Sequence, residues 1–197
     1  METAKEFFKH ELGDMLDAER KMLEIIEQTQ NETNNPQMQK ALEQHYSQTE
    51  GQIERLEQCF QELGEEPEES ECKGVIGLRQ EKETFMQEQP SEELIEAFNL
   101  GATLKTEHYE IAAYTALIDL AEKLDMRKAA RLLGQNLREE QQMLKKAETI
   151  AQKFQIENTG MEEEEMEEAG EVEAAPRASR SRSTAASRNR SRTRRAA

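Results

Sequence analysis

The chain has little of what β-sheets and membrane spans need. Its 197 residues include no tryptophan, aromatic residues make up 5%, and there are only 4 prolines and 9 glycines. Strands favour aromatic and β-branched side chains, so this composition gives little support to a sheet. No apolar run approaches the roughly 20 residues of a membrane helix, and the N-terminus lacks the apolar core of a signal peptide. We therefore expect a cytoplasmic, helical protein that does not enter a membrane.

Cysteine is also scarce. Cys59 and Cys72 are the only two, which is too few for a disulfide framework. One disulfide between them and two reduced thiols are both open, and we favour the reduced thiols.

Charge is plentiful but segregated. The formal net charge of −16 argues against a nucleic-acid-binding core and against binding to anionic membranes. Residues 157–173 hold nine acidic side chains and no basic one, whereas residues 177–195 hold eight arginines and no acid. Both stretches have too little apolar content to pack. We therefore predict a folded domain over residues 1–156 and a disordered tail, acidic and then rich in Arg and Ser, over 157–197.

Three roles are open for the arginine-rich segment. It can bind nucleic acid or another polyanion through phosphate contacts. It can fold back on the acidic residues and shield their charge, or it can be an inert solubility tail. We favour the last two, because the neighbouring acidic block competes with any polyanion.

Apolar residues recur in steps of three and four along four segments, residues 3–30, 36–63, 91–124 and 126–154. This spacing places them on one face of an α-helix. A less regular segment, residues 72–88, predicts a short crossover helix between the second and third. The sequence therefore predicts an all-α four-helix bundle with one long crossover connection.

Three of these apolar faces carry a glutamate at their centre: Glu19, Glu107 and Glu140. Around Glu107 the face is built from Leu100, Leu104, Ile111, Tyr114, Ile118 and Ala121. Glutamate is almost never fully buried unless it is paired. No lysine or arginine lies on the faces at that level, so protons or a metal cation must compensate the carboxylates.

Other polar groups are expected at the same level. Glu110 lies at the side of the face that holds Glu107, whereas Glu139 and His108 should point away. On the segment 36–63, His45, Thr49 and Gln52 form the polar middle of the face. We predict a site for one or two metal ions with the ligands Glu19, His45, Glu107, Glu110 and Glu140. Thr49, Gln52 and Tyr114 are expected to hydrogen-bond these ligands without binding the metal themselves. Carboxylates with one imidazole suit iron, manganese or zinc, and of these we expect iron or manganese.

Simpler alternatives remain open for these residues. The three glutamates can be protonated or water-bridged core carboxylates. His45 can hydrogen-bond a carboxylate instead of binding the metal, and Tyr114 can be an ordinary core residue.

The chain resembles the YciE/YciF family of ferritin-like bacterial stress proteins, over roughly residues 5–155. The resemblance is carried by LGDMLDAERKML, HYSQTEGQIERLEQCF, KTEHYEIAAYTALIDLAEKL and RKAARLLGQNLREEQ. It implies a rubrerythrin-like or ferritin-like bundle and a metal centre with ferroxidase-like activity. Glu107-x-x-Glu110 is similar to a rubrerythrin helix, and Glu19 and Glu140 match the single inward glutamates.

The chain departs from the ferritin-like pattern on two helices. Di-iron centres of that kind carry Glu-x-x-His twice. Here the corresponding pairs are Thr49-x-x-Gln52 and Glu140-x-x-Met143, which leaves His45 as the one nitrogen ligand.

The leading hypothesis is a metal-binding stress protein that oxidises Fe(II) with O2 or peroxide. The alternative is a non-catalytic helical scaffold whose arginine-rich tail contacts nucleic acid or another polyanion. Apolar bundles of this type often pair, so a homodimer is also an expectation.

Overall fold

Five α-helices make up the computed structural model of the chain, which describes residues 1–157. They are α1 (Ala4–Glu32), α2 (Pro36–Leu63), α3 (Lys73–Gln87), α4 (Glu92–Lys123) and α5 (Arg127–Ala151). The described residues contain no strand, so the all-α prediction is confirmed. The predicted disorder and the roles considered for the arginine-rich segment fall on residues outside those described, and the domain boundary after residue 156 stays a prediction.

The helix ends follow from local chemistry. The hydroxyl of Thr3 accepts the amide of Glu6, whose side chain binds back to the amide of Thr3, and these two bonds form a capping box that starts α1. Asn35 caps α2, whose first residue, Pro36, has no amide hydrogen to leave unpaired. Gly64 ends α2 with φ of 71°, a left-handed conformation that glycine adopts without steric cost.

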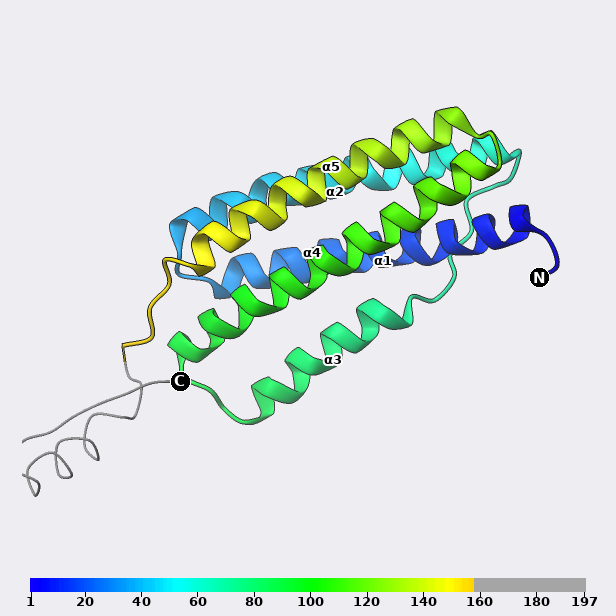
Figure 1. Cartoon of the computed structure of the whole chain (residues 1–197). Coiled ribbons are helices and arrows are strands. Elements are labelled where there is room, and N and C mark those ends of the chain that lie inside the picture. The colour runs from blue at the N-terminus through cyan, green and yellow to red at the C-terminus, as the bar shows by residue number, and fades with distance from the viewer. Residues whose placement is uncertain (158–197) are drawn as a thin grey trace, which may run out of the picture. The chain divides into compact units, whose positions relative to one another are not determined.

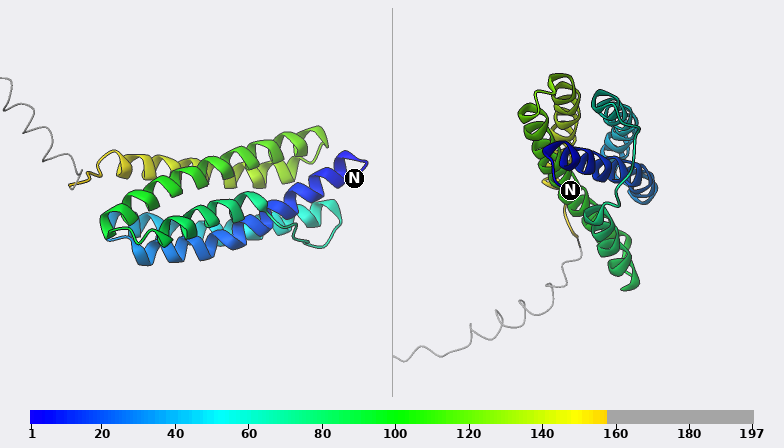
Figure 2. Two further views of the ribbon diagram at one scale, coloured as in Figure 1. Left: turned by 90° about the horizontal axis from the view of Figure 1, so that it is seen from below. Right: turned by 90° about the vertical axis from the view of Figure 1, so that its right-hand side faces the viewer.

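α1, α2, α5 and α4 form a four-helix bundle, in that order around its axis (Figure 1). The connection from α2 to α4 is long and contains α3. This fifth helix lies outside the bundle, along α1 and α4, as both further views show (Figure 2). The predicted crossover helix is therefore confirmed, and it covers the α1–α4 side of the bundle.

The predicted inward faces form the core, with one correction on α4. Leu100, Tyr114 and Ala121 are buried as expected, together with Leu117. Three expected core residues, Leu104, Ile111 and Ile118, are only half-buried. The buried face is rotated toward the residues seven apart, Leu100, Glu107, Tyr114 and Ala121, because α4 packs between α1 and α5 on this side. The rotation brings Glu110 fully inside.

Helix boundaries differ from expectation by a few residues. α5 ends at Ala151 and not at Phe154, although Phe154 still packs against the core. Within residues 1–157, no helix combines the length and apolar character that crossing a bilayer requires.

Candidate metal centre

Four buried side chains from three helices meet at the middle of the bundle. His45 comes from α2, Glu107 and Glu110 from α4, and Glu140 from α5. Each offers one oxygen or nitrogen atom, and these four atoms all lie within 4.8 Å of one another. Nε2 of His45 is 3.3 Å from Oε1 of Glu107 and 3.7 Å from Oε2 of Glu140. The convergence follows from the register of the helices: Glu107 and Glu140 lie near the middle of α4 and α5, and His45 lies in the first half of α2.

Glu19 of α1 is also fully buried, but it is not one of the four converging residues. Its carboxylate accepts a hydrogen bond from the hydroxyl of Tyr114. That hydroxyl in turn accepts a bond of 2.9 Å from Nδ2 of Asn136 on α5. Tyr114 therefore orients Glu19 from behind, and the role of Glu19 as a ligand stays a prediction.

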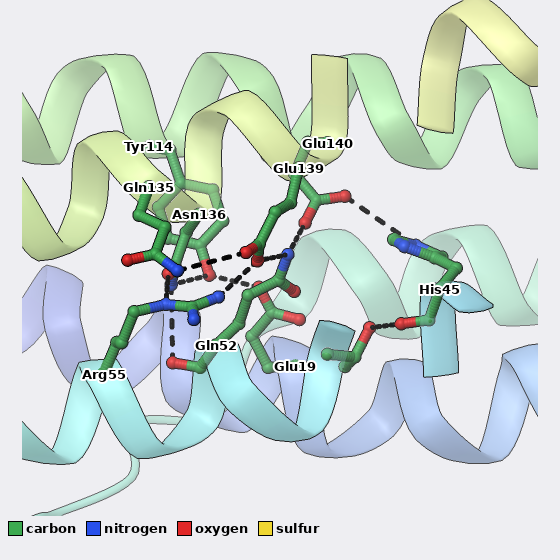
Figure 3. A network of polar contacts seen from close by, with 10 residues as sticks. Glu19, His45, Gln52, Arg55, Tyr114, Gln135, Asn136, Glu139 and Glu140 are labelled. Carbon is green, nitrogen blue, oxygen red and sulfur yellow. Dashed lines mark hydrogen bonds and ion pairs between the residues drawn. The ribbon is translucent and has the colours of Figure 1, made fainter. Parts of the chain in front are cut away.

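The polar residues of α2 support the cluster, as Figure 3 shows. Nε2 of Gln52 donates to Glu140 and also to Oε2 of Glu139, at 3.2 Å. The hydroxyl of Thr49 donates to the backbone carbonyl of His45 at 3.0 Å. Gln52 thus holds one oxygen of Glu140 in place. The hydroxyl of Thr49 bonds to the backbone of its own helix, so on this helix the imidazole of His45 is the group that joins the cluster.

One expectation about the surroundings of the site was wrong. Glu139 does not point away, because it accepts bonds from Gln52 and from Arg55 of α2. Arg55 lies beside the apolar face of α2 and not on it, and it also donates to Asn136. Its long side chain reaches across from the flank of α2 (Figure 3). The arginine balances the charge of Glu139, and within the described residues its hydrogen bonds go to Asn136 and Glu139 and not to the four converging residues.

Arg55, Asn136 and Glu139 are the functional neighbours that sequence reasoning missed. Arg55 and Glu139 are 84 residues apart in the chain. Only Asn136 carried a signal: it is a polar residue one turn before Glu140 on the same apolar face.

Unpaired buried atoms mark the site. Among the described residues, seven buried side-chain nitrogen or oxygen atoms have no hydrogen-bond partner, and six of them are here. Those six are one oxygen each of Glu19, Gln52, Glu107, Glu110 and Glu140, and Nδ1 of His45. Leaving a buried polar group unpaired costs about 1–3 kcal/mol, so such a concentration calls for an additional partner.

Burial shifts the carboxyl groups strongly toward the neutral form. It raises the pKa of both Glu107 and Glu140 to about 8. Burial, reinforced by the nearby carboxylates, holds the pKa of Glu19 and of Glu110 well above the ordinary value. In the metal-free protein the neutral form of these groups is therefore favoured, because several carboxylates cannot be ionised together in an apolar core.

The donor set matches a hard or intermediate divalent metal. Carboxylate oxygens and one imidazole nitrogen suit iron, manganese or zinc, and the absence of thiolates at the cluster disfavours a soft ion. Both cysteines are free and buried, as expected, and the protein's described part contains no disulfide. His108 is exposed, in agreement with its expected place on the flank. A buried cluster of this kind could hold a metal ion.

Comparison with known proteins gives a consistent result. Residues 3–160 match the family model of a domain of unknown function, DUF892. The chain is 35% identical to protein YciF of Escherichia coli K12 over 141 residues, covering 71% of this chain and 85% of YciF.

Solved structures share the fold. The crystal structure of the E. coli stress protein YciF matches with a TM-score of 0.72 and 33% identity, covering 77% of this chain and 96% of YciF. YcfI of Rhodopseudomonas palustris, a proposed structural protein, matches with a TM-score of 0.73 and 31% identity, covering 76% and 95%. A protein from Xanthomonas campestris pv. campestris, at 20% identity and a TM-score of 0.60, covers 77% and 96% and supports the fold alone. The chain therefore belongs to the DUF892 family, with YciF as a relative, and the resemblance to YciE/YciF proteins is confirmed.

Proposed function

We propose that this protein binds iron or manganese between His45, Glu107, Glu110 and Glu140, and that Fe(II) is its substrate for oxidation by O2 or peroxide. The observation that carries the proposal is the convergence of four buried ligand atoms within 4.8 Å, and each of the four residues also has a buried polar atom without a hydrogen-bond partner. A bound cation would pair those atoms and compensate the carboxylates. We propose that the site holds one or two ions, and we favour iron or manganese over zinc.

The residues present fit one ion better than two. Each of the two ions of a ferritin-like centre takes a histidine from a Glu-x-x-His pair, but here α2 offers only His45 and α5 has Met143 where the second histidine would be. Glu19, bonded to Tyr114, is the remaining buried carboxylate at this level, and we propose it as the additional ligand. When bound, the metal would supply a Lewis acid and a one-electron redox centre.

The surrounding residues would prepare the ligands for this task. Gln52 fixes one oxygen of Glu140 and leaves its Oε2 free of hydrogen bonds. The imidazole of His45 presents Nε2 to Glu107 and Glu140. Leu42, Leu56 and Met22 belong to the buried apolar core around the bundle centre and would limit access of water. Ligands held in this way lose little freedom on binding a metal, which favours affinity.

Metal content of the purified protein tests the proposal. Protein prepared without chelator is analysed beside the double variant Glu107→Gln/Glu140→Gln, after circular dichroism has shown that the variant is helical. We expect close to one iron or manganese per wild-type chain and a large loss in the variant. Glu96→Gln is the matched control, because Glu96 is also buried but bonds Thr33 and Asn34. Equal and negligible metal in all three proteins would contradict the proposal.

The second candidate function is a non-catalytic scaffold that contacts nucleic acid or another polyanion through its arginine-rich segment. It is favoured by the likeness to YcfI, described as a proposed structural protein, and by the eight arginines of residues 177–195. Gel shifts with and without residues 174–197, over a salt series, test it. Binding that is lost on truncation and weakened by salt would support the scaffold; binding that survives truncation, or no binding, would exclude it.

A further inference from the structure

A cavity of about 50 Å3 lies where α3 covers the bundle. Residues from α1, α2, α3 and α4 line it, among them His45 and Glu107 of the candidate metal centre. The other lining residues become more exposed toward α3: Met22 and Leu42 are buried, Leu78 is half-buried, and Arg79 is exposed. The cavity therefore connects the outer face of the protein with the two buried ligands.

The walls of the cavity are mostly apolar and its rim is basic. Met22, Ile25, Ile26, Leu42, Leu78 and Ala102 supply the apolar lining. Arg79, Lys105 and the acid Glu81 are exposed at the rim, whereas Lys82 is buried. Polar groups in the lining come from Gln28, Thr29, Asn99, Thr103 and Thr106. A hydrated cation passing here would have to shed water against a largely apolar lining, which is costly.

Each of the three basic side chains is paired with a carboxylate: Lys105 donates to Glu81 at the rim, and the other two have partners outside the cavity. Arg79 lies 3.0 Å from Glu24, and Lys82 donates to Glu32, which also accepts a 3.1 Å bond from Nδ2 of Asn99. These contacts hold α3 in place over the opening, even though Val75 and Lys82 are its only buried residues. α3 is thus a thin cover, and Leu78 is its apolar contribution to the cavity.

We propose that this cavity is a binding site and access route for a small uncharged molecule, of the size of dioxygen, on its way to His45 and Glu107. A space of about 50 Å3 exceeds the minimum of about 10–15 Å3 that one water needs, and it is too small for a larger organic molecule. Its buried lining includes His45 and Glu107, each of which has a polar atom without a hydrogen-bond partner. The importance of the route for turnover rests on the proposed function, whereas binding in the cavity does not.

Xenon tests the cavity without any metal. Crystals of the metal-free protein under xenon pressure should show one xenon site among Met22, Leu42, Leu78 and Ala102, because apolar cavities bind xenon. Ala102→Leu, which adds three carbon atoms to the cavity, should abolish it. Ala116→Leu is the control, since Ala116 is exposed on the same helix and does not line the cavity. No xenon in the wild type, or equal occupancy in Ala102→Leu, would overturn the proposal.

Nitric oxide, an uncharged diatomic molecule, tests the route in protein loaded anaerobically with Fe(II). We expect Ala102→Leu to slow its binding about tenfold, the effect of about 1.4 kcal/mol added to a barrier, at unchanged iron content. Leu78→Ala, which widens the cavity, should speed it. Equal rates at equal iron content would overturn the route. Wild-type protein that takes up no iron would instead refute the proposed function, and the xenon result would still decide the cavity.

The rim charge gives a separate check. Lys105→Gln should leave the rate of nitric oxide binding unchanged, because an uncharged molecule does not feel the rim. A tenfold change in that rate would contradict passage of an uncharged species.

Discussion

Nε2 of His45 on α2 lies 3.3 Å from Oε1 of Glu107 on α4, and each side chain has its other polar atom buried without a partner among the described residues. The helices bring two potential ligands to hydrogen-bond distance in an apolar core and still leave both incompletely paired. A metal ion bound between the two side chains would give them the partner that they lack.

Metal should stabilise the folded protein. A ligand that binds only the folded state, present at 100 times its dissociation constant, adds about 2.7 kcal/mol. For a domain of this size that corresponds to a rise in melting temperature of about 5–10 °C. Calorimetry of the metal-free protein with and without Mn(II), or Fe(II) under argon, measures the shift. His45→Ala should reduce it, and an equal shift in the variant would show that the metal binds elsewhere.

The metal-free protein should lose stability as pH rises from about 4.5 to 8. Burial raises the pKa of Glu107 and of Glu140 to about 8 in the folded protein, against an ordinary value of 4.5. Between these values the folded state holds more protons than the unfolded state, so the free energy of unfolding falls as pH rises. Each carboxyl contributes a slope of up to about 1.4 kcal/mol per pH unit.

Urea denaturation at several pH values measures this slope. Glu107→Gln removes one titrating group, so its stability should depend less on pH and should exceed that of metal-free wild type at pH 8. An identical pH profile for the two proteins would contradict the burial of an ionisable carboxyl at this position.

Tyr114→Phe should destabilise the protein by about 1–3 kcal/mol, because the buried carboxylate of Glu19 loses its hydrogen-bond donor and Nδ2 of Asn136 loses one of its two acceptors. Chemical denaturation gives the change. Tyr46→Phe is the matched control: Tyr46 is half-buried, and its hydroxyl has no hydrogen bond within residues 1–157. A loss no larger than that of the control would show that the Tyr114 hydroxyl contributes nothing to stability.

Neither cysteine should react quickly with a thiol reagent in the folded protein. Cys59 and Cys72 are both fully buried, and burial raises the pKa of Cys59 to about 12 and that of Cys72 above its ordinary value. The thiolate is the reactive form. Titration should find almost no reactive thiol in native buffer and two per chain in denaturant; rapid labelling of the native protein would argue against this packing.

The four long helices and the inward glutamates could be read from the sequence, because a helix repeats its faces at fixed intervals. Glu19, Glu107 and Glu140 each interrupt an apolar face in the sequence, and all three are buried in the structure. The rotation of α4 about its own axis could not be predicted in this way. Leu104 and Ile111 fit the spacing as well as the buried residues do, and only packing against α1 and α5 decides which side turns inward.

The charged residues next to the site could not be predicted from the sequence either. Arg55 and Glu139 lie beside the apolar faces of their own helices, so each alone predicts a solvated side chain. They meet because α2 and α5 are neighbours in the bundle. A contact between two flanks depends on the rotation of both helices, which periodicity in a single sequence does not define.

Anomalous diffraction from crystals of protein purified without chelator tests the central claim most directly. Data collected on both sides of the iron and manganese absorption edges identify the element and its position together. The account predicts a peak bounded by Nε2 of His45 and the carboxylates of Glu107, Glu110 and Glu140. An empty cluster in metal-saturated crystals, or a peak bound only by surface residues, would contradict it.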